Sequence, residues 1–390
     1  MVYSNWYLLL FLLLPVAFIS GWWVARHGKR KINQLQLPKI HSDYFKGLNF
    51  VINEEPDKAI EVFTKMIEID SETVETHLAL GNLFRRRGEV DRAIRIHQNL
   101  IARPTLNKEY REQALLELGK DYLRLGILDR AEGLFLELTA SELMVEQSFR
   151  YLLDIYQQEN DWEKAINIAK KLQKITGDKY ELVISQFHCE LAKFNLQHND
   201  EKEARNHLKR ALNTYPRCVR ASLMEGELFI SAGDYKSAIN SFKRIEKQDP
   251  EYINEVLVPL QECYKVIGRE DKFKEYLMEL LESHEGIKTL VMLTNEIGQQ
   301  EGSNSAINFI SKRLNNNPTV EGVDQLISYI VQKSDGELKQ HLTAVKELTS
   351  SLLKSRLGYK CNRCGYEAKL IHWQCPSCKN WETVKPVQGI

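Results

Sequence analysis

The sequence has no surplus of charge of either sign, because 53 lysine and arginine residues balance 53 aspartate and glutamate residues. General nucleic-acid binding needs an excess of cationic side chains to neutralise phosphates, so we expect no nucleic-acid partner. Cysteine is scarce and odd in number, with 7 in 390 residues and four of them close together near the C-terminus. This distribution argues against the disulfide framework of a small secreted protein.

Catalytic signatures are also missing from the sequence. It contains no Walker loop, no G-x-S-x-G elbow, no H-E-x-x-H pair and no convincing pair of carboxylates. Cys189, Cys218 and Cys263 are isolated in the sequence, and a lone cysteine in a helical segment is usually a small buried hydrophobe. The sequence therefore predicts a protein that is not an enzyme.

One long apolar run is present, at the N-terminus. Residues 1–25 carry no charged side chain, and a mostly apolar helix over residues 6–25 would cross the roughly 30 Å hydrocarbon layer. Basic residues follow the run directly, whereas a cleaved signal peptide carries its basic residues before it. We therefore expect a transmembrane anchor over residues 1–25, a basic polar tether over 26–42, and the bulk of the chain in the cytoplasm.

The middle of the chain repeats itself. Small or aromatic anchor residues recur every 33 to 39 residues, at Ala59, Ala93, Ala131, Ala165, Ala204, Ala238, Phe273 and Ala306. The pattern resembles the tetratricopeptide-repeat family, whose helix–turn–helix unit has 34 residues. Small residues allow the two helices to approach, an aromatic ring fills the gap and glycine accommodates the turn. We expect an all-α solenoid of about eight to nine helix pairs over residues 43–350.

The resemblance also predicts where partners bind. In this family the first helix of each pair normally lines a concave surface, since each repeat contacts mainly its neighbours. The candidates for partner contacts on this chain are Asn82, Arg85 and Lys120, together with Glu227 and Glu262.

The C-terminal residues 356–390 change character. Two C-x-x-C pairs, Cys361 with Cys364 and Cys375 with Cys378, are separated by ten residues. Four thiolates at this spacing can close a tetrahedron around one ion, iron or zinc, and leave no open position for a substrate. We expect a small rubredoxin-like or zinc-ribbon domain with a structural metal ion. Gly365 suits a turn position of positive φ, and Trp373 and Trp381 are expected to fill the domain's own small core.

The combination of anchor, repeats and four-cysteine tail resembles the lipopolysaccharide assembly protein family of Gram-negative inner membranes. The most specific stretches are HLALGNLFRRRGEVDRAIRIHQ at residues 77–98 and the closing CNRCGYEAKLIHWQCPSCKNWETVKP. The resemblance implies a non-catalytic adaptor that helps a membrane AAA+ zinc metalloprotease degrade the UDP-acyl-N-acetylglucosamine deacetylase. It further implies an inner-membrane regulatory protein that restrains the adaptor when lipopolysaccharide is scarce.

Two other interpretations remain open at this point. The chain could instead be a scaffold that organises lipopolysaccharide synthesis and transport proteins at the inner membrane without driving proteolysis. An iron-containing electron-transfer protein is the third interpretation, and it rests on the four cysteines alone.

Overall fold

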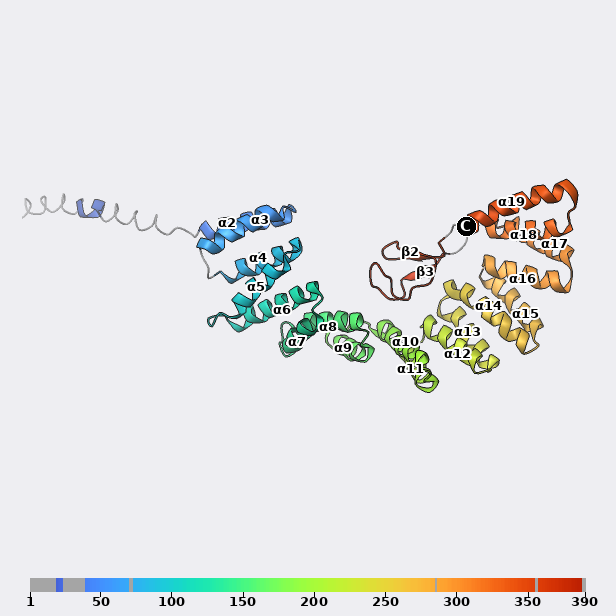
Figure 1. Cartoon of the computed structure of the whole chain (residues 1–390), viewed down its shortest axis with the longest axis horizontal. Coiled ribbons are helices and arrows are strands. Elements are labelled where there is room, and N and C mark those ends of the chain that lie inside the picture. The colour runs from blue at the N-terminus through green and yellow to red at the C-terminus, as the bar shows by residue number, and fades with distance from the viewer. Residues whose placement is uncertain (1–18, 24–38, 70–72, 285, 355–356, 388–390) are drawn as a thin grey trace, which may run out of the picture. The chain divides into compact units, whose positions relative to one another are not determined.

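The computed structural model describes residues 19–23, 39–69, 73–284, 286–354 and 357–387 (Figure 1). The predicted anchor and tether lie mostly outside these residues. Within them, residues 19–23 form a short helical stretch with exposed side chains. None of the helices in the described ranges has the length and apolar character needed to cross a bilayer.

The first of two compact units covers residues 1–155, and its described part is helical. Its helices are α2 (Lys39–Ile52), α3 (Pro56–Ile69), α4 (Val74–Arg87), α5 (Val90–Ile101), α6 (Lys108–Leu125), α7 (Leu128–Leu138) and most of α8 (Val145–Glu159). Consecutive helices pack as pairs, α2 with α3, α4 with α5 and α6 with α7.

The second unit covers residues 156–390 and continues the pattern. Its helices are α9 (Trp162–Thr176), α10 (Glu181–Gln197), α11 (Glu201–Thr214), α12 (Val219–Ser231), α13 (Tyr235–Gln248), the 3-10 turn η1 (Pro250–Tyr252), α14 (Ile253–Val266), α15 (Glu270–Ser283), α16 (Ile287–Gln300), α17 (Ser303–Leu314), α18 (Val320–Lys333) and α19 (Gly336–Lys354). From α10 onward the helices again pack as consecutive pairs. The prediction of a tetratricopeptide-like helical array is confirmed.

The anchor positions found in the sequence explain the pairing. Each lies in the second helix of a pair and is at most 1% exposed, from Ala59 in α3 to Ala306 in α17. The turns inside several pairs contain a glycine of positive φ, such as Gly88 at +90° and Gly126 at +75°. Both glycines end the first helix in a left-handed cap, which a residue with a Cβ adopts only with strain.

Glycine inside the first helix has a second role, which is to receive a ring from the second helix. The contact recurs as Gly47 with Phe63, Gly119 with Phe135 and Gly226 with Phe242. A Cβ on Gly119 would lie only 2.6 Å from Cε1 of Phe135, so a larger residue would displace the ring. In the α4–α5 pair a histidine, His97, takes the ring position against Gly81.

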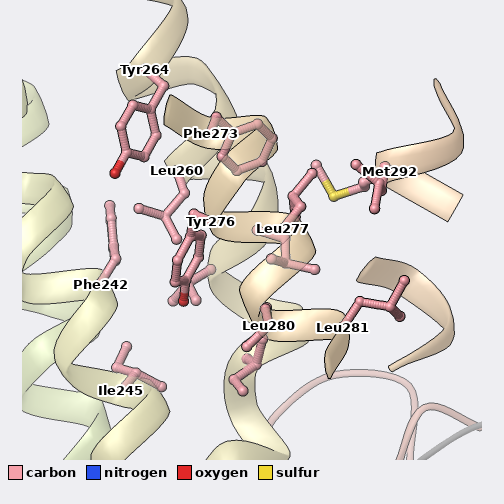
Figure 2. Packing of buried hydrophobic residues seen from close by; sticks show 14 of the residues in the cluster. Phe242, Ile245, Leu260, Tyr264, Phe273, Tyr276, Leu277, Leu280, Leu281 and Met292 are labelled. Atoms are coloured by element: carbon pink, nitrogen blue, oxygen red, sulfur yellow. The ribbon is translucent and has the colours of Figure 1, made fainter. Parts of the chain in front are cut away.

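The core of the second unit is continuous across several repeats. Figure 2 shows side chains of α13 (Phe242), α14 (Leu260), α15 (Tyr276) and α16 (Met292) in one cluster. Because this cluster runs through successive pairs, each pair is stabilised by its neighbours as well as by the packing within the pair.

A small antiparallel sheet follows the last helix. Its strands are β1 (Tyr359–Cys361), β2 (Glu367–Ala368) and β3 (Val384–Pro386), in the order β2-β1-β3. Tyr359 pairs with Ala368 on one side, and Cys361 pairs with Val384 on the other. The sheet brings the beginning and the end of the C-terminal domain together around the cysteines.

Candidate metal centre and its docking face on the repeats

The four predicted metal ligands converge on one point. The Sγ atoms of Cys361, Cys364, Cys375 and Cys378 all lie within 4.8 Å of one another. Cys361 and Cys378 are 3.8 Å apart at Sγ, and Cys364 and Cys375 are 3.6 Å apart. A tetrahedral ion with metal–sulfur bonds of about 2.3 Å needs sulfur atoms about 3.8 Å apart, so the arrangement fits one ion. This confirms the predicted tetrahedral site of four cysteines, which suits iron and zinc equally.

Both C-x-x-C pairs use the same turn. The backbone N–H of Gly365 donates to the carbonyl of Cys361 at 3.0 Å, and that of Lys379 donates to the carbonyl of Cys375 at 2.9 Å. Gly365 has φ of 77° and Lys379 has φ of 58°. The positive φ expected at Gly365 is therefore confirmed. The second turn places a lysine in the same conformation, at a small cost in backbone strain.

The protein stabilises thiolates at two of the four sulfurs. Burial raises the pKa of the Cys361 thiol, but the Thr383 hydroxyl, 3.4 Å from its sulfur, and hydrogen bonds from two backbone N–H groups outweigh burial and bring the pKa to about 6. The backbone N–H of Asn380 and its side chain lower the pKa of Cys378. Burial raises the pKa of Cys375 to about 11. A metal ion must therefore displace the Cys375 proton when it binds.

The chemistry available at this centre is structural. Four protein ligands complete the coordination of a tetrahedral ion and leave no position for a substrate. The sequence offers one further metal-binding side chain in this domain, His372, but it packs edge-on against Tyr366 at a centroid distance of 6.0 Å and is outside the ligand group. The ion would hold together a domain whose own apolar core is very small.

The indole of Trp381 packs against the repeats. Its Nε1–H donates to Oε1 of Gln157 in α8 at 2.9 Å. The ring also meets two aromatic rings edge-on, Trp162 of α9 at 6.2 Å and Phe187 of α10 at 5.8 Å. The side chain is 8% exposed, so most of its surface is covered in this position.

Trp373 makes the second aromatic contact with the repeats. It stacks on Tyr252 at 5.5 Å with an interplanar angle of 20°. The Arg220 guanidinium of α12 lies 5.9 Å from the centre of the same indole. Tyr252 is fully buried, and its hydroxyl donates to the carbonyl of Val384 at 3.2 Å. The expectation that both tryptophans fill a core of their own is therefore wrong, because each packs on the solenoid.

Charged groups complete this contact. Lys385 forms an ion pair with Asp249, and its ammonium also lies 4.6 Å from the centre of the Tyr252 ring. Glu382 is 9% exposed, and its pKa is raised to about 7 by burial and by the nearby Asp249 carboxylate, against the effect of Lys385. We call the repeat residues that receive the domain the docking face: Gln157, Trp162, Phe187, Arg220, Asp249 and Tyr252.

The docking face was not predicted from the sequence. Its members are spread over α8, α9, α10, α12, the turn between α13 and η1, and η1 itself, and no short motif links them. The C-terminal domain did contain one signal of docking. Its two tryptophans have more aromatic surface than a domain of under thirty residues can bury in its own core, so part of that surface needs another partner.

The predicted partner-binding residues of the first unit lie together in one network. Arg85 donates to Asn82 at 2.5 Å, to Glu117 at 2.6 Å and to Asp121 at 2.8 Å. Lys120 donates to Glu117 at 2.7 Å. These contacts join α4 to α6, so Asn82, Arg85 and Lys120 have structural partners within the array. Their role in binding another protein stays a prediction, as does that of Glu227 and Glu262 in the second unit.

The three cysteines inside the repeats are all buried, as predicted. Two of them are not isolated, however, because Cys189 and Cys218 approach to 3.8 Å at Sγ. Their sequence separation of 29 residues hides the pairing, which only the packing of α10 beside the start of α12 creates.

Comparisons with known proteins agree with this architecture. Residues 359–386 match the family described as rubredoxin metal binding domain, and residues 76–109 and 191–253 match tetratricopeptide repeats. Lipopolysaccharide assembly protein B of Escherichia coli (strain K12) is 37% identical over 98% of this chain and 98% of its own length. The Haemophilus influenzae protein of the same name is 34% identical over the same shares.

A solved structure of Naa15/Naa10 bound to HypK-THB is a more distant likeness. It is 14% identical, with a TM-score of 0.44, and the match covers 85% of this chain and 58% of that chain. So distant a likeness carries no functional information.

Proposed function

Because this chain belongs to the lipopolysaccharide assembly protein B family, we propose that it acts in lipopolysaccharide assembly as a non-catalytic adaptor. Its proposed action is to promote degradation of the UDP-acyl-N-acetylglucosamine deacetylase by a membrane AAA+ zinc metalloprotease. The proposed location is the bacterial inner membrane, with a single span and the bulk of the chain in the cytoplasm. An inner-membrane regulatory protein is the proposed restraint on this activity.

The observation that carries the proposal is that the similarity to these relatives extends over nearly the whole of both chains. The relatives match over 98% of both chains, so the repeats and the metal-binding domain both have counterparts in them. A partial match to the repeats alone would support only a generic protein-binding role, since tetratricopeptide arrays serve many functions.

The architecture supports an adaptor rather than an enzyme. The four-cysteine centre has no open coordination position, and the helix pairs form extended surfaces that suit protein partners. Anchoring an adaptor and a protease in one membrane would raise their effective concentration without any new contact between them.

The proposal is tested by the lifetime of the deacetylase after translation is blocked. Cells that lack this chain should degrade the deacetylase several-fold more slowly than cells that contain it. A Cys375→Ala variant should behave like the deletion if the metal-binding domain is needed. The matched control is Cys263→Ala, which removes an equally buried cysteine that is not a metal ligand.

An unchanged lifetime would favour the alternative function, a scaffold for lipopolysaccharide synthesis and transport proteins. In that case the purified chain should retain several biosynthetic enzymes at once. Loss of the chain should then alter their association and leave the deacetylase level as it was.

A further inference from the structure

Cys189 and Cys218 form a pair of thiols inside the second unit. Cys189 lies in α10, and Cys218 is the N-cap residue of α12. Their Sγ atoms are 3.8 Å apart, and both side chains are fully buried. The pair belongs to an apolar cluster with alanine and leucine side chains of α10 to α12, but polar groups also reach it. The Gln186 amide lies 3.7 Å from the Cys218 sulfur, and Arg220, two residues after Cys218, pairs with Glu190 at 2.8 Å.

The two thiols are not equivalent. A hydrogen bond from the Cys189 S–H, the nearby Ser185 side chain and a hydrogen bond from the backbone N–H of Ala221 lower the pKa of Cys218, against the effect of burial. The last of these donors belongs to the first turn of α12, where the helix dipole also favours a negative charge. Burial raises the pKa of Cys189 well above its usual value. Cys218 is therefore placed as the nucleophile, and Cys189 as a protonated donor beside it.

We propose that Cys189 and Cys218 form a redox-active dithiol that a small peroxide converts to a disulfide. The Cys218 thiolate attacks one peroxide oxygen, the O–O bond breaks, and with one added proton the products are a Cys218 sulfenic acid and water. The Cys189 sulfur then attacks the Cys218 sulfur, and the hydroxyl leaves as a second water molecule that takes up the Cys189 proton. The two thiols are oxidised by two electrons and the peroxide is reduced; a dithiol reductant reverses the step.

Disulfide formation would act on the docking face. The sulfur atoms must move from 3.8 Å to about 2.05 Å, which draws the first turn of α12 toward α10. Arg220 is in that turn, two residues after Cys218, and it contacts both Glu190 of α10 and the indole of Trp373. Oxidation should therefore loosen the metal-binding domain from its contact at Trp373.

Burial restricts the oxidant to a small molecule. Both thiols lack exposure, so a peroxide reaches them only when the start of α12 opens locally. This predicts slow oxidation by hydrogen peroxide and essentially none by a protein oxidant that must dock on the sulfur.

The test uses the zinc-loaded full chain in detergent, treated with hydrogen peroxide, alkylated, digested and mapped by mass spectrometry. We expect a cross-linked peptide pair containing Cys189 and Cys218, which dithiothreitol separates. Cys263, also buried but with no thiol partner in the described part of the chain, should remain an alkylatable thiol and serves as the internal control. If Cys189 and Cys218 stay reduced at a peroxide dose that already oxidises the four metal-ligand cysteines, the pair is an inert part of the core.

Two variants separate the roles of the cysteines. In Cys189→Ala, Cys218 should accumulate as a sulfenic acid that dimedone labels, whereas in Cys218→Ala dimedone should label neither position. Equal labelling in both variants would overturn the assignment of Cys218 as nucleophile. If either variant fails to fold, the wild-type peptide map decides the proposal by itself.

Hydrogen exchange measures the effect on the docking face. Peptides containing Trp373 should lose protection when the wild-type chain is oxidised, and keep it when the Cys189→Ala chain receives the same peroxide dose. Equal protection in the oxidised and reduced wild-type chain would refute the link between the disulfide and docking.

Discussion

At the residue scale, one position of the α4–α5 pair differs from the other pairs. It is the position in the second helix whose ring packs on a glycine of the first helix. His97 occupies the place that phenylalanine has in three other pairs, and its Nδ1 lies 2.6 Å from Oδ2 of Asp121. Both side chains are fully buried. A phenylalanine could fill this space, but only a polar ring can also contact a carboxylate of the next repeat. His97 therefore joins two repeats by a hydrogen bond as well as by packing.

Glu382 makes the stability of the second unit depend on pH. Its carboxyl has a pKa of about 7 in the folded chain, above the ordinary value of 4.5, so the folded state binds the proton more tightly than the unfolded state does. The stabilising contribution is complete below pH 4.5 and is lost as the pH rises through 7. A shift of this size corresponds to at most about 3 kcal/mol of unfolding free energy.

We predict that Glu382→Gln removes this pH dependence. The variant should match the wild type near about pH 5 and be more stable at about pH 8, by up to about 3 kcal/mol, because glutamine stays neutral in the same buried position. Urea unfolding of the zinc-loaded chain, followed by tryptophan fluorescence, measures the difference. Glu367→Gln alters an exposed carboxylate of the same domain and should change little. If Glu382→Gln is less stable than the wild type at about pH 8, the folded chain favours the charged Glu382 carboxylate and the prediction is wrong.

At the scale of the elements, ion pairs join consecutive repeats of the first unit. Arg85 of α4 contacts Glu117 and Asp121 of α6, and the Asp121 side chain has no exposed surface. Burial alone would disfavour the charge of Glu117, but Lys120 and Arg85 reverse this and lower its pKa. The network therefore keeps charged residues inside the array by pairing each with its opposite.

Replacing Arg85 should destabilise the first unit strongly. Arg85→Ala leaves the buried Asp121 carboxylate without its cationic partner, which typically costs about 3–5 kcal/mol. The matched control is Arg87→Ala, two residues away, which breaks pairs with Asp57 and Glu89, whose side chains are 77% and 28% exposed. That change should cost under about 1 kcal/mol. Chemical denaturation monitored by circular dichroism compares the two, and equal losses would mean that burial is not what makes the Arg85 pairs important.

The same reasoning affects the search for partner-binding residues. A loss of function in Arg85→Ala would follow from instability alone, so it would not identify a partner contact. Lys120 makes fewer such contacts, since its ammonium pairs with Glu117 at the edge of the network and lies 5.7 Å from the centre of the Tyr151 ring, so its replacement should disturb stability less.

At the scale of the whole molecule, a distant part of the sequence completes the second unit. The metal-binding domain contacts residues as far back as Gln157, across 224 residues of sequence from Trp381. The domain has little core of its own, so its fold depends on the metal ion. The fold in turn holds Trp373, Trp381 and Lys385 in the positions from which they contact the docking face. Metal binding and docking are thus coupled within this unit.

We predict that metal removal releases the domain while the helices remain folded. A strong chelator should leave the helical circular dichroism nearly unchanged and should expose residues 359–386 to proteolysis. Trp373→Ala tests the other half of the coupling, because it should weaken docking while the chain still binds one metal ion. If the chelator also melts the helices of α9 to α14, the domain is an integral part of their fold rather than a docked module.

Much of the architecture could be predicted from the sequence, because its causes are local. The small residues that recur at a spacing of about 34 residues, and the turn glycines, reflect packing and turns inside single helix pairs. Each C-x-x-C pair reflects one tight turn. These patterns were sufficient to predict the helix pairs and the four ligands Cys361, Cys364, Cys375 and Cys378. The positive φ of Gly365 followed from the same local reasoning.

The tertiary structure alone decided which distant surfaces meet. The docking of Trp373 on Tyr252, the pairing of Cys189 with Cys218 and the contact of His97 with Asp121 each join residues from separate helices or turns. Such contacts depend on the rotation between successive repeats, which accumulates along a solenoid and has no signature in any single repeat. Sequence therefore determined what the parts of this protein are, and packing determined which of their side chains act together.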